Sequence, residues 1–298
     1  MSLKKYITYI KVVETGSLTK AAEILNYTQP SISQMISSLE EEYGFSLLVR
    51  QKNGVKPTEN GLKVLKAMRE IEKGYGKLSE TVDEINGLET GNIRIGAYIS
   101  IATNWMPKIL SEFKQLYPFI EIQLYEGNAS ELERWLDEDK IDFAIGSSYH
   151  NKGYFRFLSE DPIVAVMNSQ HELAQSDVID IRTLESVEYI LPYSDSLFEV
   201  HDLIKKAGIQ PRVAYRIRGD ETIIAMVRNN LGISLLPQLL LSHSPLDNIT
   251  VKPLSSYTSR KVGILTNTTK HAQTPSIHKM IHFIEEWVEK HHHQERFN

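Results

Sequence analysis

A short N-terminal segment concentrates side chains that donate and accept hydrogen bonds without carrying charge. Glutamine amides pair with adenine edges, serine hydroxyls bond to bases or phosphates, and a proline ring can contact a thymine methyl group. Such groups on one helix are typical of a helix that reads base edges in the major groove of DNA. We expect Gln29, Ser33 and Gln34 to contact base edges, and Ser31 and Ser37 to contact phosphates. The full set of predicted contacts on this helix is Thr28, Gln29, Pro30, Ser31, Ser33, Gln34 and Ser37.

Capping residues place this segment on the second helix of a closely packed pair. Ser17 is a candidate N-cap for a helix over 18–25, and Asn26 tolerates the left-handed conformation of a tight turn. Thr28 is a candidate N-cap for the next helix, which ends near Gly44. Two helices joined by a short turn form a helix-turn-helix pattern. The alternative is a helical hairpin that serves only for packing.

A cationic hairpin follows the helix pair. The residues after Phe45 alternate and then reach Asn53-Gly54, a dipeptide that favours a tight hairpin turn. Arg50 and Lys52 lie on or near the tip of this two-stranded wing, where they can contact phosphates, as can Lys20 on the first helix of the pair. The alternative is an ordinary solvated surface.

A long helix is predicted from Thr58-Glu59 to about Gly87. Its apolar residues recur in steps of three and four, which makes a seam suited to a partner helix. We expect this seam to form a dimer, and the alternative is packing against its own body. The seam consists of Val64, Met68, Ile71, Tyr75, Leu78, Val82 and Ile85.

The sequence changes character after a short linker over 87–92. Strands alternate with helices from there on, which predicts a largely parallel α/β sheet. The expected strands cover 93–98, 120–125, 141–146, 161–167, 187–191, 213–218 and 260–266. The expected helices cover 101–116, 129–139, 195–207, 220–230 and 276–290.

Composition excludes several classes of protein. The 298 residues contain no cysteine, which excludes disulfides, thiolate metal sites and cysteine nucleophiles. The N-terminus lacks the apolar core of a signal peptide. The longest apolar stretch, 231–241, is too short to span a bilayer. We therefore expect a cytoplasmic protein without a membrane partner. The net charge is −5, yet residues 1–66 carry 9 Lys/Arg against 6 Asp/Glu. This mildly basic N-terminal part is compatible with DNA binding.

The N-terminal motifs resemble those of the LysR-type bacterial transcriptional regulators. The resemblance rests on the Ala21-Ala22 pair, the Thr-Gln-Pro-Ser-Ile-Ser run from Thr28, and the Leu-Val-Arg run that ends at Arg50. It continues through Trp105-Met-Pro and the Gly-Ile-Ser-Leu-Leu-Pro run from Gly232, so it covers essentially the whole chain. Val49 departs from the family, which usually has Phe at this position.

The resemblance implies a fold and a domain order. Residues 1–58 would form an all-α winged helix-turn-helix domain, 59–91 a linker and dimerisation helix, and 92–298 an α/β effector domain of the type II periplasmic-binding-protein kind. That effector domain would have one lobe over 92–161 and 265–298, and a second lobe over 162–264, joined by two crossover strands.

The family resemblance also implies partners. Such regulators bind an imperfect dyad in double-stranded DNA as homodimers or homotetramers, sense a small metabolite and act on RNA polymerase. No cofactor is expected besides that effector.

We expect the effector between the two lobes, where strands end and helix N-termini offer backbone N–H groups that favour an anion. A small carboxylate is the predicted class, although Asp195, Asp220 and Glu221 could instead receive an amine or a hydroxyl. The same small polar residues could serve only as helix caps. The predicted effector contacts are Ser100, Asn128, Ser130, Ser147, Ser148, Ser194, Ser196 and Thr222.

Two other classes remain as rivals, an enzyme and a transport solute-binding protein. The chain has no Gly-x-Ser-x-Gly elbow, no His-Glu-x-x-His helix and no Walker loop, which argues against an enzyme. His278 and His282 have a spacing that could hold a metal, but no third ligand is evident. The missing export signal argues against a solute-binding protein. The run His291–His293 is compatible with a native tail or with cloning residues.

Overall fold

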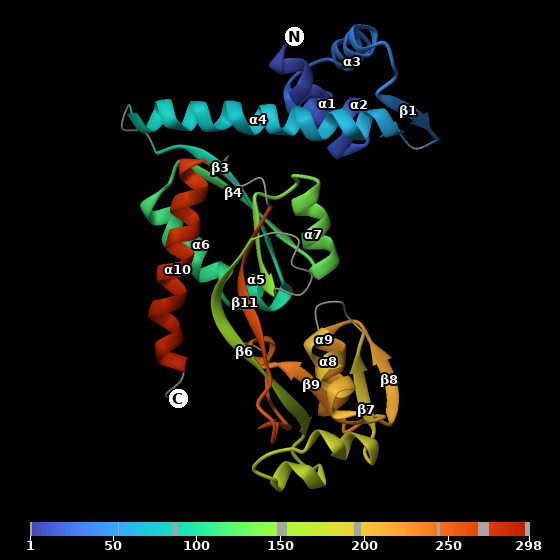
Figure 1. Ribbon diagram of the computed structural model, residues 1–298, viewed down its shortest axis with the longest axis vertical. Coiled ribbons are helices and arrows are strands. Elements are labelled where there is room, and N and C mark those ends of the chain that lie inside the picture. Colours follow the sequence, from blue (N-terminus) through green and yellow to red (C-terminus); the bar gives the residue numbers. More distant parts are fainter. Residues whose placement is uncertain are drawn as a thin grey trace. The chain divides into compact units, whose positions relative to one another are not determined.

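The computed structural model describes residues 2–52, 54–85, 89–147, 154–193, 198–242, 245–267 and 274–295. Its contacts divide the chain into two units, with the main boundary between Gly91 and Asn92 (Figure 1). None of the helices in the described ranges combines the length and the apolar character that crossing a membrane requires. The two units are described separately.

The first unit is a helical head with a small wing and a long final helix. Its capping residues act as the sequence predicts, because the Ser17 side chain accepts a hydrogen bond from the Lys20 N–H and Asn26 adopts a left-handed φ of 56°. Its elements are α1 (Leu3–Thr15), α2 (Leu18–Leu25), α3 (Gln29–Tyr43), the antiparallel strands β1 (Leu48–Gln51) and β2 (Gly54–Pro57), and α4 (Glu59–Ile85).

The core of this head joins the three short helices to the start of α4. Ala21 and Ala22 are buried where α2 packs, and Ile32 and Leu39 of α3 are fully buried. Met68 of α4 belongs to the same core, and Val64 packs against it. These two residues were predicted to lie in a dimer seam, and this prediction is wrong for Met68, which the head itself buries. A helical period gives the apolar face but not the partner that covers it.

The second unit is an α/β body with two cores. The elements around the first core are β3 (Gly91–Ala97), α5 (Ile99–Asn104), α6 (Met106–Leu116), β4 (Ile120–Glu126), α7 (Ala129–Asp137), β5 (Phe143–Ser147), β11 (Ser259–Thr266) and α10 (Pro275–Glu295). Those around the second core are β7 (Tyr189–Pro192), α8 (Phe198–Ala207), β8 (Val213–Ile217), α9 (Asp220–Arg228), β9 (Ser234–Pro237) and β10 (Ile249–Pro253), with short 3₁₀ helices over 172–175 and 181–185. The long strand β6 (Tyr154–Asn168) runs from the first lobe into the second.

The main sheet is mixed, in the order β10-β6-β11-β5-β3-β4, with β9 also paired to β6. Strand β6 runs antiparallel to β9, β10 and β11, and β11 runs antiparallel to β5. The pairs β3–β5 and β7–β8 are parallel. The expectation of a largely parallel sheet is therefore wrong. The chain passes out to the second lobe along β6 and returns along β11, so the two strands must run in opposite directions.

The crossover strands also correct the expected lobe boundary at 264/265. Val262 and Ile264 of β11 lie in the first core, so the return to the first lobe occurs earlier in the strand. In Figure 1, α6 and α10 lie side by side, and the rings of Phe113 and Phe283 meet edge to face at 5.4 Å between these helices.

Several predicted elements differ in extent. The expected helix over 101–116 is broken at Trp105, because Pro107 falls in the first turn of α6 and cannot continue the hydrogen bonds of α5. Strand β6 begins at Tyr154 rather than near 161, and strands β9 and β10 were not predicted. The final helix continues to Glu295 and includes the backbone of the His291–His293 run.

Candidate functional site

The outer face of α3 presents the polar residues predicted to read DNA. Gln29, Pro30, Gln34 and Ser37 are exposed, whereas Ser33 is half-buried. Residues 30, 33, 34 and 37 follow the i, i+3, i+4, i+7 spacing of one helix face, and the buried residues Ile32, Ile36 and Leu39 occupy the other. Packing therefore fixes the helix while leaving two glutamine side chains free to meet base edges.

Two of the predicted DNA contacts, Thr28 and Ser31, bond to each other at the start of α3. The Thr28 Oγ1 accepts a hydrogen bond from the Ser31 N–H at 3.3 Å, and the two hydroxyl oxygens lie 2.8 Å apart. A hydroxyl engaged in this way keeps the start of α3 in position and is less available to a phosphate. Thr28 and Ser31 thus form the N-terminal cap of α3.

The wing is held against the helices by hydrogen bonds that sequence analysis missed. The Glu40 Oε1 of α3 accepts from the N–H groups of Leu47 and Leu48, at 2.6 and 3.2 Å. The Val55 N–H donates to the Gly16 carbonyl at 2.9 Å. A Cβ on Gly54 would lie only 2.3 Å from the same carbonyl oxygen, so this close approach requires glycine at position 54. The wing therefore has a fixed place beside α3.

The cations of the head lie at its surface. Lys20, Arg50, Lys52 and Lys56 are exposed, and the last three belong to or border the wing strands. Asn53, the other half of the predicted turn, lies outside the described residues. Exposed cations beside a polar helix face suit phosphates on either side of a groove.

The outer part of α4 carries an uncovered apolar stripe. Ile71, Tyr75, Leu78, Val82 and Ile85 are each 47% exposed or more within the single chain. Large apolar side chains in a row are costly in water, so such a stripe indicates a contact surface. These five residues, unlike Val64 and Met68, remain available to a partner helix.

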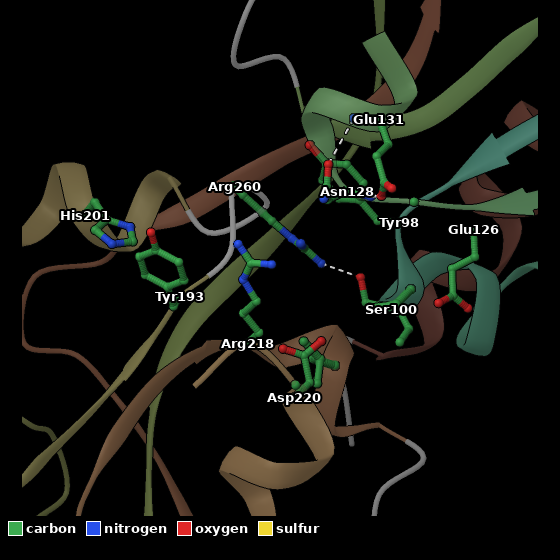
Figure 2. A pocket seen from close by; sticks show the side chains of 14 residues that line it. Tyr98, Ser100, Glu126, Asn128, Glu131, Tyr193, His201, Arg218, Asp220 and Arg260 are labelled. Carbon is green, nitrogen blue, oxygen red and sulfur yellow. Dashed lines mark hydrogen bonds between the residues drawn. The ribbon is translucent and has the colours of Figure 1, made fainter. Parts of the chain in front are cut away.

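The second unit contains a cavity of about 500 Å³ between its two lobes. Figure 2 shows the guanidinium groups of Arg218 and Arg260 on one side of Ser100, with Asp220 nearby. The first lobe and crossover strand β11 supply Tyr98, Ile99, Ser100, Glu126, Gly127, Asn128, Glu131 and Arg260. The second lobe and the 3₁₀ turn over 238–241 supply Tyr193, His201, Arg218, Gly219, Asp220 and Leu240.

Arg260 is the most constrained charged group of this cavity. It is 2% exposed, and its Nη2 donates to the Ser100 hydroxyl at 2.6 Å. Its Nε donates to the Asp161 carboxylate at 2.9 Å, and that carboxylate also accepts from the Leu239 N–H at 2.8 Å. This network joins both crossover strands to α5, so the arginine is held in one orientation at the wall of the cavity.

The cavity and its surroundings mix both signs of charge. Burial raises the pKa of Asp220, although the charge of Arg260 opposes that rise. Burial likewise raises the pKa of Glu199 on α8, whose Oε2 is buried without a hydrogen-bond partner among the described residues. The guanidinium of Arg218 lies 5.4 Å from the centre of the Tyr193 ring, a cation–π distance. The cavity thus offers cations to an anion and carboxylates to a hydroxyl or amine.

Replacing Glu199 by glutamine is expected to change how stability depends on pH. A raised pKa means that the folded chain binds more protons than the unfolded chain above the ordinary value of 4.5, so stability declines as pH rises through that window. The variant lacks this decline, so its melting temperature should gain on that of the wild type as pH rises above 4.5. Thermal unfolding at a series of pH values above 4.5 measures the difference, with a Glu172→Gln variant at an exposed residue as control. A constant difference at all pH values would contradict the expectation.

The structure places some of the predicted effector contacts at the cavity and others away from it. Ser100 and Asn128 line the cavity, and Ser147 is hydrogen bonded to the hydroxyl of Tyr98, which lines it. Ser130 and Thr222 are exposed and lie outside the cavity lining, so the structure does not bring them into the cavity and their role stays a prediction. Ser148, Ser194, Asp195 and Ser196 lie outside the described residues.

The charged and aromatic residues of the cavity were not predicted from the sequence. Arg218, Arg260, Tyr193 and His201 all line it, and none was predicted. One signal was available for Arg260, because strand alternation puts it on the same face as Val262 and Ile264, both buried. A charged residue on the buried face of a strand indicates a partner or a site.

His282, one of the two histidines with a metal-ligand spacing, has another contact, because its Nε2 lies 3.1 Å from the carboxylate of Glu286. The ring of His291, in the histidine run, stacks on Trp287 at 4.1 Å. In the ranges that the structure describes, no group of three or more potential ligands among His, Cys, Asp and Glu comes together.

Comparison with protein families matches both units. Residues 3–62 match the model described as bacterial regulatory helix-turn-helix protein, lysR family. Residues 86–289 match the model described as LysR substrate binding domain. The first match covers the helices and wing of the head, and the second covers both lobes around the cavity.

Individual relatives extend over most of the chain. A HTH-type transcriptional regulator of Bacillus subtilis, YvbU, is 31% identical over 274 residues, which cover 91% of this chain and 94% of that protein. A full-length OxyR variant from Pseudomonas aeruginosa has the same fold, with a TM-score of 0.76, 20% identity and 97% of each chain covered. The effector binding domain of QuiR in complex with shikimate matches 68% of this chain and 99% of its own, with a TM-score of 0.60 and 22% identity.

Proposed function

This chain belongs to the LysR family of bacterial transcriptional regulators, and from that premise we propose how it reads DNA and what it senses. It is a DNA-binding regulator with an effector-binding domain, and its relatives are named as regulators rather than enzymes. We propose that it binds a dyad-symmetric DNA site as a homo-oligomer, contacts RNA polymerase there, and responds to a small carboxylate without a resident cofactor.

The DNA-reading part of the proposal rests on one observation. Gln34 is exposed on the face of α3 opposite its buried residues, Gln29 is exposed at the first turn, and the wing beside α3 carries exposed cations. This arrangement matches a recognition helix that contacts bases while a wing contacts the backbone. The exposed stripe of α4 supports pairing of two chains, which would present two such helices to the two halves of a dyad.

Selection from a random DNA library by the purified full-length chain tests this part. Because a dimer binds half-sites about one helical turn or a multiple of it apart, we expect one enriched motif with that spacing at physiological salt. A library that shows no enriched sequence would refute sequence-specific recognition.

Gln34→Ala and Lys52→Ala are expected to change DNA binding in different ways. Loss of the Gln34 amide should cost about 1–3 kcal/mol of discrimination at the base it contacts. Loss of Lys52 should weaken binding to all sequences similarly and reduce the slope of log K against log salt by about 1. Fluorescence anisotropy on matched and substituted duplexes at several salt concentrations measures both. An unchanged base preference in Gln34→Ala would remove that residue from the interface.

The effector part of the proposal rests on the cavity between the lobes. Arg218 and Arg260 favour a carboxylate, whereas Glu126, Asp220 and the Asn128 amide favour hydroxyl or amino donors on the same molecule. Shikimate, which the related QuiR domain holds, is one such hydroxylated acid. Thermal unfolding with a panel of hydroxylated acids should raise the melting temperature for the correct class. A panel of amines that stabilises the chain while acids do not would refute the carboxylate.

A further inference from the structure

A second cavity of about 320 Å³ lies next to the effector cavity in the same unit. The two cavities share Ile99, Ser100, Asp220 and Leu240 as lining residues, so these four residues border both. The second cavity adds wall residues from α5, from α9 and from the segment after the 3₁₀ turn: Thr103, Asn104, Glu221, Ile224, Arg228 and Pro245.

The walls of the second cavity differ in chemistry from those of the first. Ile224, Pro245 and the shared Ile99 and Leu240 give it apolar walls, and Ile224 is only 5% exposed. The Asn104 amide is already used, because its Nδ2 donates to the carbonyls of Ser100 and Leu239. Apolar walls next to a charged cavity suit the hydrocarbon part of an amphipathic ligand.

Arg228 provides a polar group at this second cavity. Its Nη2 donates to the Pro245 carbonyl at 2.7 Å, which holds the side chain in place. Its Nε is buried and has no hydrogen-bond partner among the described residues. A buried N–H without an acceptor is unfavourable, so an acceptor oxygen on a ligand would satisfy it. Asp220 and Glu221 also line this cavity and would repel a second negative charge, so a neutral acceptor fits best.

We propose that the effector is an elongated acid that occupies both cavities. Its carboxylate binds Arg218 and Arg260, its apolar chain passes Ile99 and Leu240, and a neutral oxygen at its far end accepts a hydrogen bond from Arg228. This inference rests on the proposed function, because it extends the same effector site. The effector inferred here is therefore longer and more amphipathic than the small carboxylate of the proposed function.

Calorimetric titration of the full-length chain with acids of graded length tests the proposal. The probes are monomethyl succinate, monomethyl adipate and monomethyl suberate, which carry one carboxylate and a distal ester oxygen, and octanoate, which lacks that oxygen. We expect binding to tighten about fourfold for each added methylene until the second cavity is filled. Monomethyl suberate should bind at least tenfold more tightly than octanoate because it also bonds to Arg228.

Two variants assign these effects to the second cavity. Thr103 is exposed and lines the second cavity but not the first, so Thr103→Phe should fill the second cavity, abolish the dependence on length and leave monomethyl succinate unaffected. Ser111→Phe adds the same ring at an exposed residue that lines neither cavity, so it should behave as wild type. Arg228→Met should abolish the advantage of monomethyl suberate over octanoate. Binding of monomethyl succinate with no gain for longer acids, or an unchanged length dependence in Thr103→Phe, would overturn the elongated effector and leave the proposed carboxylate site intact. Failure of every acid to bind would overturn both.

Discussion

Arg260→Gln is expected to destabilise the second unit by about 3–5 kcal/mol, because it leaves the buried Asp161 carboxylate without its cation. Asp161 is 4% exposed, and its Oδ2 lies 2.7 Å from the Arg260 Nη2. For a domain of this size the loss corresponds to a fall in melting temperature of roughly 6–20 °C. The same change removes one of the two arginines that line the cavity, so added acids should no longer raise the melting temperature. Thermal unfolding with and without ligand measures both effects.

Two further variants separate the buried pair from charge in general. Arg156 of β6 pairs with Glu285 at 2.8 Å, but its side chain is 63% exposed, so Arg156→Gln should cost no more than about 1 kcal/mol. The double variant Asp161→Asn, Arg260→Gln has no unpaired buried charge and should recover most of the lost stability. If the two single arginine variants are equally stable, or if the double variant is no better than Arg260→Gln, the assigned role of the pair is wrong.

Leu78→Asp is expected to break the pairing of two chains and to weaken binding to a dyad site by a factor of about 10²–10⁴. Linking two DNA-reading heads makes the second contact intramolecular, and that gain disappears when the chains separate. Leu78 is 62% exposed in the middle of the α4 stripe, so a carboxylate there should leave the fold of the head unchanged. Light scattering gives the oligomeric mass, and anisotropy on full and half sites gives the affinity.

Ser79→Asp is the matched control for that change. It adds the same charge at the next residue, which is exposed and lies outside the apolar stripe, so oligomeric mass and DNA affinity should stay near wild type. A dimeric Leu78→Asp, or equal losses in the two variants, would exclude the stripe as the interface between chains.

The head could be predicted almost residue by residue because its boundaries depend on local interactions. Ser17, Asn26 and Thr28 act on neighbours within four residues, so their types alone indicate where α2 and α3 begin and end. Met68 shows the limit of this reasoning. It fits the seam of α4 by spacing, and only the folded head shows that it belongs to the buried core shared with the short helices.

The effector cavity was harder to predict because its walls come from distant segments. In the sequence, Arg260 lies 160 residues from Ser100 and 99 residues from Asp161. No local pattern indicates contacts between residues so far apart. The predicted effector contacts were instead small polar residues at the starts of helices. At such positions helix capping and ligand binding favour the same residue types. Asn128 illustrates the ambiguity, because it forms a capping box with Glu131 and also lines the cavity.

The pairing of β6 with β11 also determines how the two lobes can respond to a ligand. In the described ranges the chain passes between them along these two strands, which are paired over Tyr154–Pro162 and Ser259–Thr266, with an irregularity between Val262 and Gly263. A Cβ on Gly263 would lie 2.3 Å from the Arg156 carbonyl oxygen, so no side chain fits at that point. Twisting of this strand pair keeps its hydrogen bonds, whereas sliding of one strand along the other would break them. We therefore expect an effector in the cleft to turn one lobe against the other rather than to shift it along the strands.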